Sequence, residues 1–268
     1  MSQRPPDRRP KKPAWAVDKD RARRLGPETV WLFGLHAVRD ALLNPARVKR
    51  RLILTRNAAQ RLGPDAIIAG GLDPETADAR KFPPVLDPQS VHQGAALQAE
   101  PLDWGPLEQL CAPQGPRDLA VLLDRVTDPH NVGAVLRSAE VFGARAVIAP
   151  ARHSAPETGA LAKTASGALE RQPYLRVKNL STTMEGLKDL GWTVLGLDGE
   201  AERDLAEALP ALPPGPLALA LGAEGPGLRD KTRETCDALA RIPSAASFAS
   251  LNVSNAAAVA LFAAAGRG

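Results

Sequence analysis

The stretch that decides the fold is LAVLLDRVTDPHNVGAVLRSAEVFGARAVIAP, residues Leu119–Pro150. It opens with an apolar run that ends at Asp124, and a polar turn containing Asp128 and Pro129 follows. A helical pattern over Asn131–Phe142 then leads into a second apolar run. Two short apolar runs joined by a helix are typical of a strand–helix–strand unit with parallel strands, so this stretch predicts an α/β domain.

The same alternation continues toward the end of the chain. The apolar runs expected as strands are Leu119–Asp124, Ala144–Pro150, Trp192–Asp198, Leu217–Gly225 and Leu239–Pro243. The helices expected between and after them are Asn131–Phe142, Pro156–Leu169, Ser181–Leu190 and Asn255–Ala265. Continuous apolar strands separated by helices predict a mostly parallel sheet covered on both faces. Ligands bind such sheets at the carboxyl ends of the strands, which is where the polar and glycine-rich residues lie here.

The region before this domain predicts a second, smaller α/β domain. A short apolar entry at Val30–Phe33 runs into a helical segment at Gly34–Leu43, and Arg50–Thr55 reads as a strand. Prolines and glycines then gather in residues 105–118, as in a linker. We therefore divide the chain into a leader at 1–28, a small domain at 29–104, the linker at 105–118 and the larger domain at 119–268.

The positive charge of the chain is concentrated in the leader. The formal net charge is +4, but residues 1–28 alone contain nine Lys/Arg and four acidic residues, so the rest is close to neutral. The leader is also rich in proline and lacks apolar periodicity, which predicts disorder. A basic arm attracts a polyanion such as RNA by releasing counterions, although a solvated tail that aids solubility is an equally open alternative.

Cysteine usage and hydropathy favour a cytoplasmic protein without a metal. The two cysteines, Cys111 and Cys236, have neither a CxxC partner nor a nearby histidine, so we expect buried thiols in a reducing compartment. The longest apolar run, Ala256–Ala265, is half of the roughly 20 residues that a membrane span needs. The leader is too polar for a signal peptide. We expect no membrane association.

Three segments carry residues suited to chemistry, and the first is the helix after Asp124. Asn131 and Arg137 lie six residues apart, slightly under two helical turns, so both are expected to face one cleft. The alternative is that Asn131 caps the helix and Arg137 pairs with a surface carboxylate.

The other two segments follow later strands. LGAEGPGL (Leu221–Leu228) places three glycines around Glu224, which allows a close approach of backbone to a ligand. It matches neither a GxGxxG fingerprint nor a phosphate-binding P-loop, and Glu224 as a turn cap is its alternative role. RIPSAASFASLNVSNAAAVALF (Arg241–Phe262) crowds Ser250, Asn252, Ser254 and Asn255 before an alanine-rich helix. Simple helix capping is the alternative, and it explains Ser254 and Asn255 better than Ser250 and Asn252.

Together and in this order, the three segments resemble the signature motifs of the SpoU (TrmH-like) group of SPOUT RNA 2′-O-ribose methyltransferases. The resemblance extends through KTASGALERQP (Lys163–Pro173) and LGWTVLGLDGEA (Leu190–Ala201). It also includes GLHAV (Gly34–Val38) and HQGAALQAEP (His92–Pro101), so it covers nearly everything after the leader. Within the group the chain is most similar to the RlmB type, which methylates a guanosine ribose in the P loop of 23S ribosomal RNA.

The resemblance implies a fold, a cofactor and partners. It implies a knotted α/β domain of SPOUT type at the C-terminus, a small L30e-like α/β domain that holds RNA, and a homodimer in which both chains build each active site. The methyl donor would be S-adenosyl-L-methionine, bound by Gly222, Ala223, Ile242, Pro243, Leu251 and Asn252, largely through main-chain atoms. The catalytic residues would be Arg137, Asn131, Glu224, Ser250 and Asn252, with no metal.

Two points of the resemblance bear on chemistry. The family usually has Met and then Gly after the Ile-Pro of the third motif, where this chain has Ser244 and Ala246. An alanine forced into positive φ would cost on the order of 1 kcal/mol. A free guanidinium is a poor base, so for Arg137 we favour a role in anchoring the phosphate next to the reactive ribose. Direct proton abstraction by an Arg137 of lowered pKa is the alternative.

Competing functions come from three directions. The runner-up within the same chemistry is a tRNA 2′-O-ribose methyltransferase. A non-catalytic RNA-binding protein would fit the N-terminal half, but the presence of Asn131, Arg137, Glu224 and Asn252 in their motif places argues against it. A nucleotide-dependent oxidoreductase on a doubly wound fold is disfavoured by the absent GxGxxG.

Overall fold

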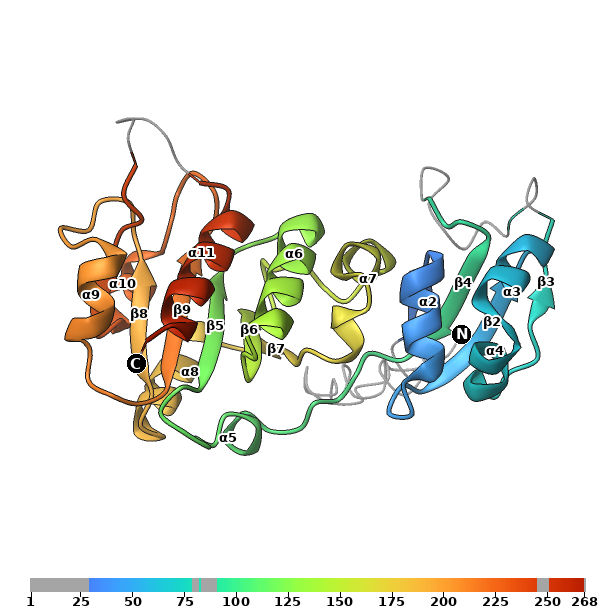
Figure 1. Cartoon of the computed structure of the whole chain (residues 1–268), viewed down its shortest axis with the longest axis horizontal. Coiled ribbons are helices and arrows are strands. Elements are labelled where there is room, and N and C mark those ends of the chain that lie inside the picture. Colours follow the sequence, from blue (N-terminus) through green and yellow to red (C-terminus); the bar gives the residue numbers. More distant parts are fainter. Residues whose placement is uncertain (1–28, 79–81, 83–90, 245–250, 268) are drawn as a thin grey trace, which may run out of the picture.

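The chain forms two α/β units that lie side by side (Figure 1). The structure is a computed structural model that describes residues 29–78, 82, 91–244 and 251–267. The leader that was expected to be disordered lies outside the described residues, and so do Ala246 and Ser250 near the other end of the chain.

The larger unit is built on a six-stranded sheet in which every neighbouring pair of strands is parallel. Its strand order is β10-β8-β9-β5-β6-β7. The strands are β5 (Leu119–Asp124), β6 (Ala146–Pro150), β7 (Tyr174–Val177), β8 (Thr193–Leu197), β9 (Leu217–Gly222) and β10 (Ala238–Ala240). All five apolar runs expected as strands form strands of this sheet, and the predicted α/β class with a mostly parallel sheet is confirmed.

Helices cover both faces of this sheet. One face carries α6 (Pro129–Val141), α7 (Gly159–Ala165), the 3₁₀ turn η1 (Ala168–Glu170), α9 (Leu205–Ala211) and α11 (Val253–Ala265). The other carries α5 (Leu107–Leu110), α8 (Leu180–Asp189) and α10 (Asp230–Thr235). Side chains of β5 alternate between the two: Leu119, Val121 and Leu123 pack on the first face, and Ala120 and Leu122 on the second. This strand is therefore buried from end to end.

Several elements depart from the sequence-based expectation, and the short helices α5, α9 and α10 were not expected. The helix expected over Pro156–Leu169 is interrupted at Ser166 and Gly167, which both have positive φ, so α7 ends there and η1 follows. Gly167 is required because a Cβ atom at this position would lie 1.6 Å from the carboxylate of Asp40. Strand β7 was not expected, because its sequence YLRV is short and only partly buried at the sheet edge.

The smaller unit is a four-stranded sheet of order β1-β4-β2-β3. Its elements are β1 (Val30–Phe33), α2 (Leu35–Leu43), β2 (Lys49–Leu54), α3 (Arg56–Leu62), α4 (Pro64–Gly70), β3 (Glu75–Thr76) and β4 (Ala95–Ala99). Strand β4 runs antiparallel to both β1 and β2, while β3 is parallel to β2. The predicted second α/β region is confirmed.

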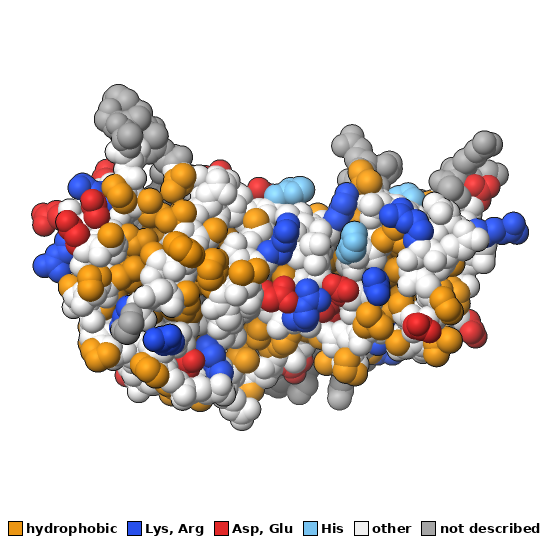
Figure 2. Space-filling view, viewed as in Figure 1, with side chains coloured by type: hydrophobic (Ala, Val, Ile, Leu, Met, Phe, Trp, Pro, Cys, Tyr) orange, Lys and Arg blue, Asp and Glu red, His pale blue; other side chains and the backbone are white. Residues whose placement is uncertain are grey.

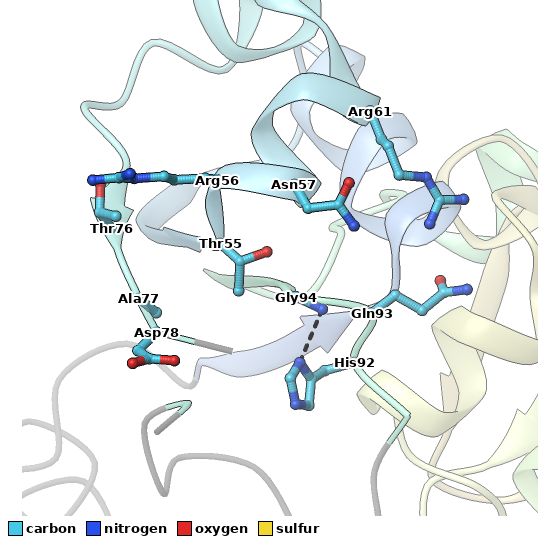
Figure 3. A pocket seen from close by; sticks show the side chains of 10 residues that line it. All are labelled: Thr55, Arg56, Asn57, Arg61, Thr76, Ala77, Asp78, His92, Gln93 and Gly94. Carbon is cyan, nitrogen blue, oxygen red and sulfur yellow. Dashed lines mark hydrogen bonds between the residues drawn. The ribbon is translucent and has the colours of Figure 1, made fainter. Parts of the chain in front are cut away.

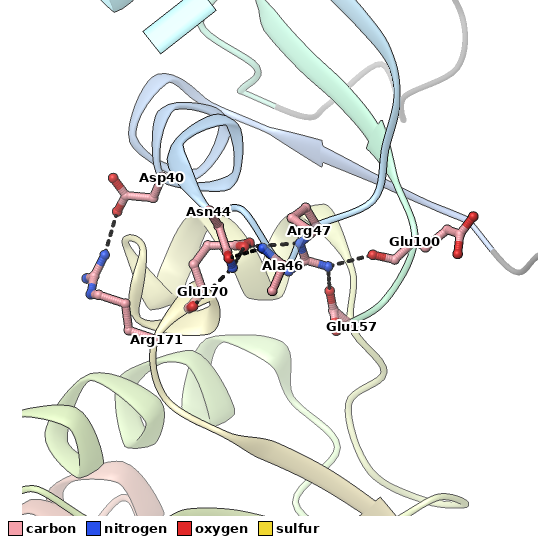
Figure 4. Close-up of polar contacts among 8 residues, drawn as sticks. All are labelled: Asp40, Asn44, Ala46, Arg47, Glu100, Glu157, Glu170 and Arg171. Atoms are coloured by element: carbon pink, nitrogen blue, oxygen red, sulfur yellow. Dashed lines mark hydrogen bonds and ion pairs between the residues drawn. The ribbon is translucent and has the colours of Figure 1, made fainter. Parts of the chain in front are cut away.

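The two units share one continuous apolar core. Residues of β1, α2, α7 and α6 belong to the same buried cluster, and Gly159 of α7 lies so close to β1 that a Cβ atom would meet the Phe33 ring at 2.2 Å. A buried arginine, Arg47, spans the junction (Figure 4). It donates to the Glu170 carboxylate at 2.6 and 3.0 Å and also to Glu157 and the Glu100 carbonyl. We call Arg47, Glu157 and Glu170 the junction clamp.

The two cysteine thiols are wholly or partly buried. Cys111 is buried and Cys236 is partly buried, and both are free. Burial raises the pKa of the Cys111 thiol to about 11 and that of the Cys236 thiol to about 12. Within the described residues, no helix has both the length and the apolar character that crossing a membrane requires.

Candidate functional site

The first part of the site is the start of α6. Asp128 is its N-cap and accepts a hydrogen bond from the His130 N–H at 2.9 Å, and Pro129 is the first helical residue. The helix therefore begins two residues before the expected Asn131, and the alternative role of Asn131 as the cap is wrong. Its side chain is instead free to reach across to other loops.

The second part is the turn that follows β9. Gly222 ends this strand, and a Cβ atom there would lie only 2.0 to 2.2 Å from backbone atoms of Gly227 and Leu228, so only glycine fits. Gly225 and Gly227 both have positive φ, and the Gly227 N–H donates to the Ala223 carbonyl at 2.9 Å. The turn folds back on the strand end and presents Glu224 at the surface.

The third part is the start of α11, where Asn252 is the N-cap. Its Oδ1 atom accepts from the Ser254 N–H at 2.9 Å, while its Nδ2 atom donates to Asn131 Oδ1 at 2.9 Å and to Glu224 Oε1. Asn131 Nδ2 also donates to Glu224 Oε1, at 3.2 Å. We call Asn131, Glu224 and Asn252 the polar triad. The capping alternative, expected for Ser254 and Asn255, is wrong for these two residues, which lie inside α11; Asn252 is the cap, and its side chain also joins all three segments.

Two residues that hold the triad in place were not expected from the sequence. Asp124, the last residue of β5, is buried and accepts from Arg229 twice, from its N–H at 3.0 Å and from Nε at 2.7 Å. This pair ties the turn after β9 to the end of β5, where Asp124 and Gly222 are already register partners. A carboxylate at the end of a buried strand was the available signal, although its partner 105 residues away was not predictable.

The triad lies at the point of the sheet where ligands are expected. The helix after β5, α6, covers one face of the sheet, whereas the helix after β9, α10, covers the other. A crevice opens outside the carboxyl ends of two adjacent strands when their connections leave to opposite faces. The polar triad lies beyond the carboxyl ends of β5 and β9, where this rule places a ligand.

The residues expected to hold the cofactor surround the same edge. Gly222 and Ala223 end β9 and begin its turn, and Ile242 and Pro243 follow β10, which is separated from β9 by β8. Ile242 is partly buried against the core. Leu251 is exposed and directly precedes Asn252 of the triad. Ser244 is exposed, while Ser250 and Ala246 lie outside the described residues.

Arg137 lies on the same helix as Asn131 but outside the triad. Six residues at about 100° each place the two side chains roughly 120° apart around the axis of α6. Arg137 is exposed, and no residue that the structure describes forms a hydrogen bond or ion pair with it. The surface ion pair proposed as its alternative role is therefore not formed with a described residue. Of the five expected catalytic residues, the structure joins Asn131, Glu224 and Asn252.

Comparison with known proteins places this site in a family. The SpoU rRNA Methylase family matches residues 118–262. The chain belongs to this family. It is 43% identical over 236 residues to the 23S rRNA (guanosine-2′-O-)-methyltransferase RlmB of Ralstonia nicotianae, covering 86% of this chain and 93% of that protein. The RlmB protein of Vibrio cholerae is 39% identical, with 86% and 94% covered.

Solved structures of SpoU methyltransferases have the same fold. AviRb from Streptomyces viridochromogenes in complex with AdoMet superposes with a TM-score of 0.73 at 25% identity, over 92% of each chain. An AdoMet-bound rRNA methyltransferase from Sinorhizobium meliloti superposes with a TM-score of 0.72, over 88% of this chain and 86% of that one. At 23% identity the latter supports the fold alone. The family resemblance expected from the sequence is confirmed.

Proposed function

We propose that this protein transfers a methyl group from S-adenosyl-L-methionine to the 2′-hydroxyl of an RNA ribose, and that its substrate is a guanosine of 23S ribosomal RNA. The observation that carries the proposal is the polar triad, which joins the three motif segments at the carboxyl edge of the sheet. We propose the substrate from the RlmB relatives, which are 39–43% identical to this chain over nearly their whole length.

The residues at this edge suit the cofactor. The turn after β9 exposes main-chain groups beside Gly222 and Ala223, and Ile242 and Leu251 offer apolar surface. Main-chain N–H and C=O groups recognise an adenine edge, and apolar side chains cover its ring. The cofactor supplies an electrophilic methyl group on a sulfonium. Within the described residues, no group of three or more His, Cys, Asp or Glu side chains is placed to hold a metal.

The residues of the chain would then position the ribose. Glu224 and Asn131 present hydrogen-bonding groups beside the cofactor turn, and Asn252 fixes their geometry by bonding to both. Positioning two reactants supplies a large share of the rate of a bimolecular reaction. Arg137 binds the neighbouring phosphate, because a guanidinium suits phosphate oxygens and that of Arg137 has no carboxylate partner among the described residues.

A homodimer completes the site in this proposal. Helices α6 and α11 present an exposed apolar face, in which Val141 is 77% and Phe262 71% exposed, and Phe262 contacts the Phe142 ring edge-on (Figure 2). Arg137 lies one turn before Val141, on the same side of α6. A second copy of the chain would bury this face and bring Arg137 to the triad of its partner.

The finer features of the fold belong to the same proposal. We infer a trefoil knot at the C-terminus, which is supported by the return of α11 against the central strands β5 and β9. The L30e-like character of the domain at 29–104, the linker at 105–118 and the methyltransferase domain at 119–268 are supported by the two separate sheets. A cytoplasmic location follows from the ribosomal substrate.

Transfer of a labelled methyl group tests the proposal. The purified protein should label the ribose of one guanosine in a 23S rRNA transcript and leave tRNA transcripts unlabelled. Arg137→Ala should reduce kcat on the order of 100-fold or more while cofactor affinity stays nearly unchanged. Arg117→Ala, an exposed arginine at the opposite edge of the sheet, is the control. If only tRNA were labelled, the substrate would be tRNA and not 23S rRNA. If Arg137→Ala lost cofactor affinity and rate in equal measure, Arg137 would be a cofactor ligand.

A further inference from the structure

The smaller unit contains a cavity that the methyl-transfer site does not use. It has a volume of about 690 Å³ and is formed by the start of α3, the end of β3 and the segment before β4 (Figure 3). Pockets of roughly 300–1,000 Å³ hold one small ligand, so this one has room for a single nucleotide. Its lining residues are Thr55, Arg56, Asn57, Arg61, Thr76, Ala77, Asp78, His92, Gln93 and Gly94.

The charges on this cavity favour an anionic ligand. Arg56 and Arg61 are exposed, and neither guanidinium forms an ion pair or hydrogen bond with any residue in the described ranges. By contrast, Arg47, Arg50 and Arg51 of the same unit all bind carboxylates. In Figure 3, Arg61 lies on the side of the cavity opposite Asp78, and Asn57 lies between them.

The floor of the cavity holds groups that can recognise a base. The Gly94 N–H donates to Nδ1 of His92 at 3.0 Å, and the His92 ring stacks on Phe82 with the ring centroids 4.0 Å apart. These two contacts fix the imidazole. Because Nδ1 accepts, Nε2 of the neutral ring carries the proton that can be donated to a ligand.

Gln93 is held beside this floor in an uncommon conformation. It has φ of 54°, in the left-handed region that residues other than glycine adopt uncommonly. Its Oε1 atom accepts from the Leu35 N–H at 3.0 Å, so the carbonyl end is fixed and the amide N–H groups remain for a ligand. Gly94 must follow, since a Cβ atom there would lie 2.3 Å from Thr55 Oγ1.

A chain of contacts leads from this cavity to the polar triad. Gly34 lies against both Gln93 and the exposed side chain of Lys163 on α7. Thr164, which follows Lys163 in the sequence, contacts His130 Nδ1 through its hydroxyl at 3.2 Å, and His130 directly precedes Asn131 of the triad. Neighbouring residues therefore connect the cavity to the triad, and the exposed basic side chain of Lys163 lies between them.

We propose that this cavity binds a second, unstacked nucleotide of the same RNA that is methylated at the triad. The inference rests on the proposed function. Arg56 and Arg61 bind the phosphates on either side of this nucleotide, and His92, Asn57 and Gln93 contact its base, by stacking and by hydrogen bonds to its edge. The shared core and the junction clamp hold the two nucleotide sites at a fixed separation, so the RNA is selected by the spacing of two extruded nucleotides as well as by its sequence.

Binding of a 23S rRNA fragment to the full-length protein, measured without cofactor at several salt concentrations, tests this proposal. For Arg56→Ala/Arg61→Ala we expect weaker binding. The salt slope should be smaller by about 0.7 for each phosphate of single-stranded RNA that the variant no longer neutralises. His92→Ala should weaken binding on the order of tenfold without changing the slope. The control is Arg50→Ala, which removes a charge at the other end of β2, where Arg50 binds Glu100.

The outcomes separate this proposal from the proposed function. In methyl-transfer assays the cavity variants should raise KM and leave kcat at saturating RNA unchanged, because the triad is intact. If Arg56→Ala/Arg61→Ala binds RNA with the affinity and salt slope of Arg50→Ala, the cavity is not a nucleotide site, although methyl transfer by the unaltered protein still stands. If the unaltered protein transfers no methyl group but its RNA binding depends on the cavity, the proposed function fails and this site remains.

Discussion

Replacing Arg47 with methionine removes the only cation of the junction clamp while keeping much of its volume. The Arg47 side chain is fully buried, and the carboxylates of Glu170 and Glu157 are 4% and 11% exposed. Burial by itself lowers the pKa of Arg47, but the hydrogen bonds and charges of the two glutamates outweigh it and raise the pKa overall. The guanidinium is therefore charged at every pH at which the protein folds, and its loss leaves two buried carboxylates without a counterion.

The size of the effect follows from this burial. Removing one partner of a buried ion pair costs about 3–5 kcal/mol, because the remaining charge stays desolvated. For a protein of this length that loss lowers Tm by roughly 10 °C. The same substitution at Arg50, three residues away in a half-exposed pair with Glu100, should cost less than about 1 kcal/mol.

The deficit of Arg47→Met should also depend on pH. Burial raises the pKa of the Glu157 carboxyl, and Arg47 is what opposes this rise. A raised carboxyl pKa gives stability that is present below the ordinary glutamate value of about 4.3 and is lost as pH rises through the folded-state value. Without Arg47 that folded-state pKa rises further. The variant should therefore lie closest to the unaltered protein near pH 5 and fall increasingly behind it toward pH 8.

Thermal and urea unfolding of both variants at pH 5, 6.5 and 8 is the measurement. Glu170→Gln combined with Arg47→Met should recover part of the loss at pH 8, since one buried charge is gone. A loss below about 1 kcal/mol at pH 8, or a loss that does not change with pH, would show that the clamp is hydrated or flexible and that the reasoning is wrong.

Three further predictions come from the site and its surroundings. Gly222→Ala should abolish cofactor binding in equilibrium dialysis, because its Cβ atom has no room beside Gly227; a variant that binds normally would show that the turn is free to move. Asn252→Ala should lower the free energy of unfolding by about 1 kcal/mol through the lost helix cap, and the loss in kcat should correspond to a much larger free energy. If the two losses were equal in free energy, the triad would be structural. Phe262→Asp should give a monomer in sedimentation and an inactive protein, whereas an active monomer would refute the shared site.

Much of the larger sheet could be predicted from the sequence because its strands are continuous apolar runs. Strands such as β5 and β9 carry almost no polar residue and end at Asp124 or at a glycine, so their type and approximate limits follow from the pattern. The roles of Asn131, Glu224 and Asn252 came from the resemblance to the SpoU motifs, and the strand pattern adds only that polar residues gather near the strand ends. Polar and glycine residues directly after buried strands are where a parallel sheet places its site.

The remaining features depend on pairs of residues that are distant in the sequence. The break after α7 falls at Ser166 and Gly167, which both have positive φ, and Asp40 of the other unit fills the space where a Gly167 side chain would lie. The partner of Asp124 is 105 residues away, and Glu170 is 123 residues from Arg47. No local pattern identifies such pairs. The edge strand β7 was missed because an exposed edge needs no apolar run.

The shared core has a consequence for exchanging parts between relatives. The proline-rich linker suggests that residues 29–104 are a module that can be cut out and replaced. Yet the segment between β6 and β7 contains Glu157 and Glu170, which bind Arg47, and Gly159, which packs against Phe33. A chimaera made at the linker alone takes the buried acids from one parent and the cation that must match them from the other. The transplantable module consists of two separate pieces of chain, residues 29–104 together with 156–171.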